Sequence, residues 1–108
     1  MAFGRRQNPT GSGTPAELPI PGGAFGADSM EIFRAWIVDR GLQVSLQRGF
    51  DDPRMWGILL ADVARHAARV YEADGAMTEA EALEAIKSLF DAEWTNMTDP
   101  GTTGRARQ

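Results

Sequence analysis

The residues best suited to acid–base chemistry lie together on one predicted helix. His66 is the only histidine of the chain, and it follows Asp62 by four residues. This spacing places both side chains on one helical face, where a carboxylate can orient an imidazole as a general base requires. Arg65 and Arg69 share that edge, so the four residues also have the i, i+3 and i, i+4 spacing of an exposed ion-pair face. We favour the ion-pair interpretation, because no nucleophile or second acid–base group stands out beside His66.

Other kinds of chemistry find little support in the sequence. The chain contains no cysteine, which excludes disulfides, thiolate metal sites and a cysteine nucleophile. A metal site would depend on carboxylates, but Asp51 and Asp52 stand at a helix start, where they serve as caps. The glycines between residues 22 and 26 neither follow a predicted strand nor lead into a helix, as a phosphate-binding loop would. We therefore assign no catalytic residue, no metal and no cofactor.

The three tryptophans are distributed one to each of three predicted elements. Trp36 lies in a predicted strand, Trp56 in the first predicted helix and Trp94 in the second. They can meet in a core, which we favour, or one or two of them can line a shallow pocket or a subunit interface, where tryptophan is enriched. Trp36 and Trp56 join the four residues of the helix edge as candidates for ligand or interface contacts.

The N-terminal half of the predicted domain is a β-hairpin. Residues 30–38 are rich in β-branched and aromatic residues, and residues 42–47 alternate between apolar and polar side chains. A two-residue loop of Arg40 and Gly41 would pair Asp39 with Leu42. A three-residue loop with Gly41 left-handed would pair Val38 with Leu42 instead. The three-residue loop suits these residue types slightly better, and the sequence alone leaves the register open.

The C-terminal half is a pair of amphipathic helices. Over residues 51–75, apolar side chains recur with a 3.6-residue period, Pro53 suits the first helical position and Gly75 suits a left-handed C-terminal cap. Alanines accumulate toward the C-terminal end of this helix, which predicts close packing against a second helix. That helix is predicted over residues 77–97, and Thr78 with Glu81 has the spacing of a capping box.

These elements define an α+β fold of order ββαα, an antiparallel β-hairpin packed on two helices. We predict one domain over residues 29–98, a flexible Gly/Pro-rich arm over residues 1–28 and a flexible tail over residues 99–108. Within the arm, residues 17–21 (Glu-Leu-Pro-Ile-Pro) are apolar and stiffened by proline, so they can lie along a groove of this subunit or a neighbour. A loose arm is the favoured interpretation.

The small size of this domain predicts self-association. The first strand is apolar on both faces, and a two-stranded ribbon is marginal in water. A domain of this size also buries a small share of its surface. A homodimer would supply the missing cover, either by extending the sheet or by packing against its face.

Composition argues against several other partners. The net charge is −4 and the basic residues are scattered or confined to the tails, so we expect no nucleic-acid binding. No apolar run is long enough to span a bilayer, and the N-terminus lacks the apolar core of a secretory signal. We therefore expect a cytoplasmic protein without a membrane partner.

One long string of residues resembles a known family. It is the helix pattern Pro-x-x-Trp-Gly-Ile-Leu-Leu-x-Asp-x-Ala-Arg-His, which begins at Pro53 and is preceded by Arg34-Ala-Trp-Ile and Leu42-Gln-Val-Ser-Leu. The pattern is similar to that of a small family of unknown function found mainly in alphaproteobacteria, over about residues 18–99. The resemblance implies a free-standing bacterial protein, and it brings no activity, cofactor or site residue.

Two functional hypotheses follow from the sequence. The first is a homodimeric or protein-binding module without catalytic activity, whose contact surface includes the hairpin and the Trp56 helix. The second is a small-molecule-binding or weakly catalytic protein with a pocket around His66, Asp62 and Arg34. We favour the first hypothesis, because the apolar strand and the thin core both leave apolar surface that another molecule would have to bury.

Overall fold

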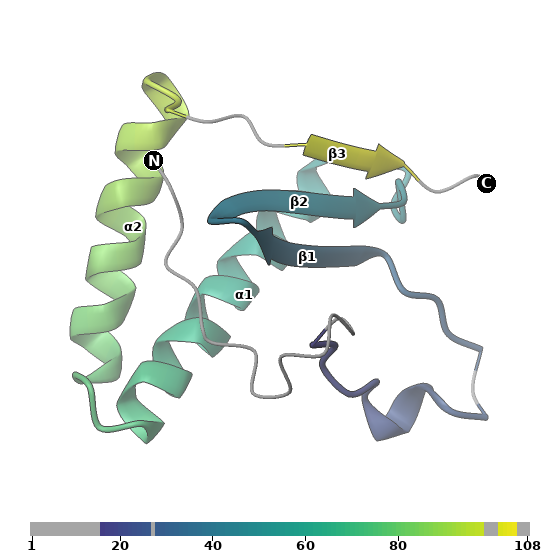
Figure 1. The fold of residues 1–108 in the computed structure, drawn as a ribbon, viewed down its shortest axis with the longest axis horizontal. Helices are drawn as coiled ribbons and strands as arrows, with labels where there is room; N and C mark the ends of the chain where they lie inside the picture. The colour runs from purple at the N-terminus through teal and green to yellow at the C-terminus, as the bar shows by residue number, and fades with distance from the viewer. Residues whose placement is uncertain (1–15, 27, 99–101, 106–108) are drawn as a thin grey trace. The chain divides into compact units, whose positions relative to one another are not determined.

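The computed structural model of the chain describes residues 16–26, 28–98 and 102–105. The chain divides into two compact units: residues 1–48 with 101–108, and residues 49–100. The first unit contains a β-sheet, and the second is a pair of helices (Figure 1). This content confirms the predicted α+β class with its β-hairpin and two helices. The predicted arm at residues 1–15 and 27, and the predicted tail at residues 99–101 and 106–108, lie outside the described residues.

The first unit is built on a three-stranded sheet in the order β1-β2-β3. Strand β1 (Phe33–Val38) pairs antiparallel with β2 (Gly41–Leu46), and β2 pairs in parallel with β3 (Thr102–Arg105). The sequence does not predict β3, because the Thr-Thr-Gly-Arg segment has neither alternation nor an apolar residue. Its pairing with β2, more than fifty residues earlier, is therefore a tertiary contact. A short 3₁₀ helix, η1 (Gly22–Ala24), precedes the sheet.

Both predicted turns of the hairpin are wrong. The turn consists of Asp39 and Arg40, with φ of 50° and 69°, and it closes on the pair Val38 and Gly41. Positive φ at both central residues is the geometry whose twist matches paired strands. The register places one apolar face of β1 opposite the apolar face of β2, in the pairs Phe33 with Leu46, Ala35 with Val44 and Ile37 with Leu42. Side-chain pairing therefore overrides the preference of glycine for the left-handed position.

The first helix of the second unit is α1 (Arg54–Ala73). Pro53 precedes it with φ −61°, and the Asp52 carboxylate accepts hydrogen bonds from the Arg54 backbone N–H (2.9 Å) and guanidinium (2.8 Å). These bonds hold the pKa of Asp52 below its ordinary value. At the other end Gly75 has φ 76° and donates to the Glu72 carbonyl, which confirms the predicted left-handed stop.

The second helix is α2 (Glu79–Thr95), and it begins with the predicted capping box. The Thr78 hydroxyl accepts from the Glu81 N–H at 3.1 Å, and the Glu81 carboxylate accepts from the Thr78 N–H at 3.0 Å. The hydrogen bond from the Thr78 N–H, followed by one from the Thr78 side chain, lowers the pKa of Glu81. The helix pair packs where its residues are smallest, because Ala68 is 0% and Ala82 is 3% exposed. The prediction of close packing at the alanine-rich end of the first helix is thereby confirmed.

Candidate functional site

The predicted acid–base pair does not form a hydrogen bond. Asp62 instead lies 3.7 Å from the guanidinium of Arg65, and both side chains are more than half exposed. His66 is exposed and makes no hydrogen bond or ion pair with any described residue. An exposed imidazole without an orienting carboxylate lacks the arrangement expected of a general base. The geometry at Asp62 agrees with the ion-pair interpretation.

Arg69 has a structural partner across the helix pair. Its guanidinium lies 3.5 Å from the Glu79 carboxylate, at the first residue of α2. The backbone N–H of Glu79 donates to the Glu72 carboxylate at 2.9 Å. The end of α1 is thereby bonded to the start of α2, so the role of Arg69 in this structure is to join the two helices.

The two tryptophans among the candidates lie in different units. Trp36 is half-buried on β1, opposite Gln43. Trp56 is half-buried on α1 and meets Phe50 edge to face, with ring centroids 5.9 Å apart at 83°. This is a favourable aromatic geometry, and it fixes the chain just before the helix. Trp56 therefore has a packing role within the second unit.

The most exposed tryptophan was not among the predicted site residues. Trp94 is 77% exposed on α2, so the core interpretation is wrong for this residue. It stacks on Phe90, one turn earlier, with centroids 5.6 Å apart, and Phe90 is itself 45% exposed. The signal was present in the sequence, since both residues are large and aromatic and their i, i+4 spacing puts them on one helical face.

The second unit carries further exposed apolar side chains, on the two helices and next to them. Those that are at least 40% exposed are Met55, Ile58, Leu60, Val63, Val70, Tyr71, Met77, Leu89, Phe90, Trp94 and Met97. Within the described residues, only Ala68 and Ala82 are buried. Exposed apolar surface, where it is large, marks a contact with another molecule.

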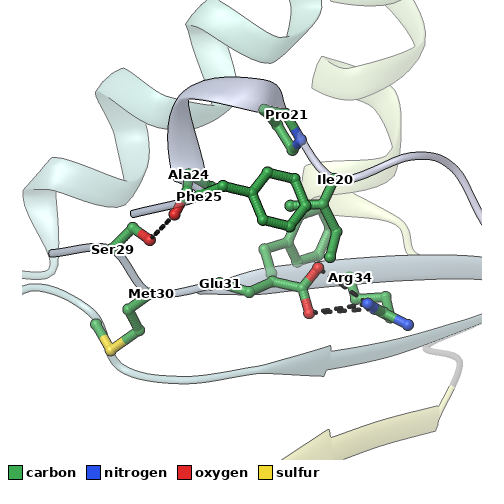
Figure 2. A pocket seen from close by; sticks show the side chains of 9 residues that line it. Ile20, Pro21, Ala24, Phe25, Ser29, Met30, Glu31 and Arg34 are labelled. Atoms are coloured by element: carbon green, nitrogen blue, oxygen red, sulfur yellow. Dashed lines mark hydrogen bonds and ion pairs between the residues drawn. The ribbon is translucent and has the colours of Figure 1, made fainter. Parts of the chain in front are cut away.

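An open groove of about 540 Å³ lies in the first unit, between the segment that precedes β1 and the start of β1. Figure 2 shows Ile20 and Phe25 from that segment beside Glu31 and Arg34. Pro21, Ala24, Ser29, Met30 and Phe33 complete the lining. Its volume is in the range of small-molecule sites, and its lining is mainly apolar with one cation, Arg34, and one anion, Glu31.

Arg34 is the charged centre of this groove. Its guanidinium bonds to both carboxylate oxygens of Glu31 at 3.2 Å and to Glu17 at 2.6 Å. The hydrogen bonds that Arg34 donates to Glu31, and then the one to Glu17, raise the pKa of Arg34. The predicted arm therefore reaches its own domain at Glu17, although Leu18 and Ile20 stay 85% and 54% exposed. The lining residues belong to the first unit, so Asp62 and His66 are not among them.

The described residues show two further features that bear on function. No group of three His, Cys, Asp or Glu side chains among residues 16–26, 28–98 and 102–105 is arranged to hold a metal ion. In the same part of the chain, no helix has both the length and the apolar character needed to cross a membrane.

The fold and these sites define a small α+β domain with an exposed apolar helix surface. Residues 17–98 match the family described as a domain of unknown function, DUF5076. The chain therefore belongs to this family, and the predicted resemblance to an uncharacterised family is confirmed at that level. Its alphaproteobacterial range and the helix motif as its hallmark stay predictions. The match begins at Glu17, the residue that bonds to Arg34.

A solved structure of similar sequence provides the fold comparison. It comes from the photosynthetic bacterium Rhodopseudomonas palustrus and is named a "putative pyruvate dehydrogenase". The two chains are 46% identical with a TM-score of 0.70, over 86% of this chain and 97% of the other. No curated protein matches the chain.

Proposed function

We propose that the protein is a homodimeric protein-association module of the cytoplasm without catalytic activity. The observation that supports this proposal is the set of exposed apolar side chains in the second unit, among them the stacked rings of Phe90 and Trp94. Exposed aromatic rings are typical hot spots of protein interfaces. Burying them would remove apolar surface of the second unit from water.

The absence of an assembled acid–base group among the described residues points the same way. His66 has no orienting partner there, and Arg69 is engaged with Glu79. The polar candidates of α1 are therefore better explained as surface and inter-helix contacts than as a reaction centre. Trp36 and Trp56 remain interface candidates beside Trp94.

Sedimentation equilibrium tests the homodimer. We expect a dimer at micromolar concentration, and we expect Trp94→Ala to weaken it at least tenfold, or by about 1.4 kcal/mol. Glu84→Ala is the matched control, because Glu84 is exposed on the same helix and carries no apolar surface. A folded wild-type monomer over the whole concentration range would exclude the proposal.

The groove at Arg34 supports a second candidate function, the binding of a small molecule. Its apolar lining and single guanidinium would suit a compact carboxylate that takes the place of Glu17. Pyruvate belongs among the first compounds to test, because of the name given to the solved relative. The groove is not lined by His66 or Asp62, so the predicted pocket that combines them with Arg34 stays a prediction.

An NMR titration with small carboxylates separates this candidate from the first. Binding in the groove predicts shift changes at Phe33 and Arg34 that disappear in Arg34→Gln. Shift changes confined to His66 would instead favour a pocket on α1. A panel that moves neither region would remove small-molecule binding from consideration.

A further inference from the structure

Strand β1 forms one edge of the sheet. In the order β1-β2-β3, the side of β2 that faces away from β1 is covered by β3. The chain thus returns from its C-terminal region to protect one side of the hairpin, as Figure 1 shows. Within the described sheet, no strand covers the corresponding side of β1.

The register shows which backbone groups point to this open edge. The Gln47 N–H donates to the Ile32 carbonyl at 2.9 Å, so these two residues form a hydrogen-bonded pair. Such pairs alternate along an antiparallel ladder, so the even-numbered residues of β1 bond to β2. The N–H and C=O groups of Ala35 and Ile37 therefore point away from β2.

The edge lacks the features that usually prevent strands from associating. Proteins protect edges with proline, lysine, bulges or inward-facing charges. Strand β1 contains no proline, lysine or bulge, and its one charged residue, Arg34, is bonded to Glu17 and Glu31. Beyond Arg34 the edge is apolar, with Ile37 45% and Val38 39% exposed.

We propose that β1 of a second copy pairs antiparallel with this edge, about a two-fold axis at Trp36. The inference rests on the homodimer proposed above and adds a sheet-edge contact to the helix surface that contains Trp94. In this register Ala35 lies opposite the partner's Ile37, and Trp36 opposite the partner's Trp36. Four hydrogen bonds then form, and they use every N–H and C=O of Ala35 and Ile37 in both copies. Aromatic cross-strand pairs add to the stability of a sheet.

The charges favour this register over its neighbour. An axis at Ala35 would offset the two Arg34 residues by two positions, or about 7 Å along the strands. The axis at Trp36 offsets them by four positions, roughly 13 Å, which exceeds the screening length of about 8 Å at physiological salt. Repulsion between the two guanidinium groups is then small.

The charges of the hairpin turn indicate that the strand pairing with β1 belongs to a second copy of this chain. Asp39 and Arg40 form no ion pair with any described residue. The register brings the partner's Arg40 opposite Ile32, next to Glu31. One guanidinium and two carboxylates give the Arg34, Glu31 and Glu17 cluster a net charge of −1, so it attracts the partner's Arg40, while the partner's Asp39 lies opposite the uncharged Phe33. The strand and its turn are thus complementary to their own copy, as a two-fold interface requires.

Single-cysteine variants test this register directly, because the chain has no cysteine. Opposed residues in a non-hydrogen-bonded pair have Cα atoms about 4.5 Å apart, which a disulfide can bridge. We expect Trp36→Cys to form a cross-linked dimer under mild oxidation. Gln43→Cys, on the central strand of the same sheet, is the control and is expected to stay uncross-linked.

An experiment in which two cysteine variants are mixed determines the position of the two-fold axis. The register places Arg34 opposite the partner's Val38, so Arg34→Cys and Val38→Cys should cross-link when mixed and not when oxidised alone. Cross-linking of Arg34→Cys with Trp36→Cys instead would place the axis at Ala35 and overturn the proposed register.

A charge substitution tests the edge without removing Trp36. Ile37→Lys should weaken the dimer at least tenfold in sedimentation while the circular dichroism spectrum is unchanged, and Gln43→Lys should leave the dimer intact. A wild-type dimer that tolerates Ile37→Lys and shows no Trp36→Cys cross-link would overturn the edge contact and leave the homodimer standing. A monomeric wild type would overturn both.

Discussion

Ala68 offers the sharpest test of how the helix pair is held together. It is 0% exposed at the packed end of α1 and α2, and leucine would add three carbon atoms to this buried position. Overpacking a closely packed site usually costs about 1–3 kcal/mol. We therefore expect Ala68→Leu to lower the free energy of unfolding by about 2 kcal/mol, within that range.

Urea unfolding followed by circular dichroism at the helical band measures this change as a lower midpoint at constant slope. The control is Ala61→Leu, which adds the same atoms at an exposed position of the same helix. Its effect should stay within about 0.5 kcal/mol, because it is a surface substitution and leucine is a good helix former. If the two variants unfolded at the same urea concentration, close approach of the helices at Ala68 would be refuted.

Three further predictions follow from helix ends and charges. Thr78→Ala removes the hydroxyl that accepts from the Glu81 N–H and should lower the free energy of unfolding, measured in urea, by about 1 kcal/mol. Thr78→Ser keeps a hydroxyl and should retain most of that free energy. Equal losses of stability in the two variants would contradict the capping role. Gly75→Ala forces a side chain into a residue with φ 76° and should destabilise by about 1 kcal/mol, whereas Gly57→Ala in the interior of α1 should stabilise by a similar amount. Hydrogen bonds from Thr78 hold the pKa of Glu81 below 4.5, and those from Thr98 do the same for Glu93. Since the folded-state pKa values are lowered, this stability is present above pH 4.5 and lost as the pH falls through the folded pKa values. The urea midpoint should therefore fall on acidification below that pH, and less so in Glu81→Gln; a midpoint that stays level would count against these bonds.

The helical half of the fold was the most predictable part. Capping signals at Thr78 and Glu81 act over three residues, and the Gly75 stop acts within one turn, so local sequence is enough to fix them. Small residues at Ala68 and Ala82 likewise mark where two helices can approach. The same local reasoning indicated a hairpin at about the right residues.

The candidate site was predicted less well. A helical spacing shows that Asp62 and His66 share a face, but it does not show whether that face is exposed or which partner each residue chooses. In the structure Asp62 pairs with Arg65, and Arg69 reaches across to Glu79. The exposure of Trp94 also depends on which helical face the neighbouring helix covers, and this is not a local property.

The sequence by itself determined the two helices with their ends, the alanine-rich contact between them and the presence of a hairpin. These features depend on propensity, period and capping, which operate over a few residues. The tertiary structure decided the Asp39–Arg40 turn, the pairing of β3 with β2, the ion pair between Glu17 and Arg34, and the open edge of β1. Each of these depends on which strand or side chain lies alongside another. Strand pairing joins residues distant in sequence through backbone groups that every residue carries, so the sequence pattern cannot specify the partner.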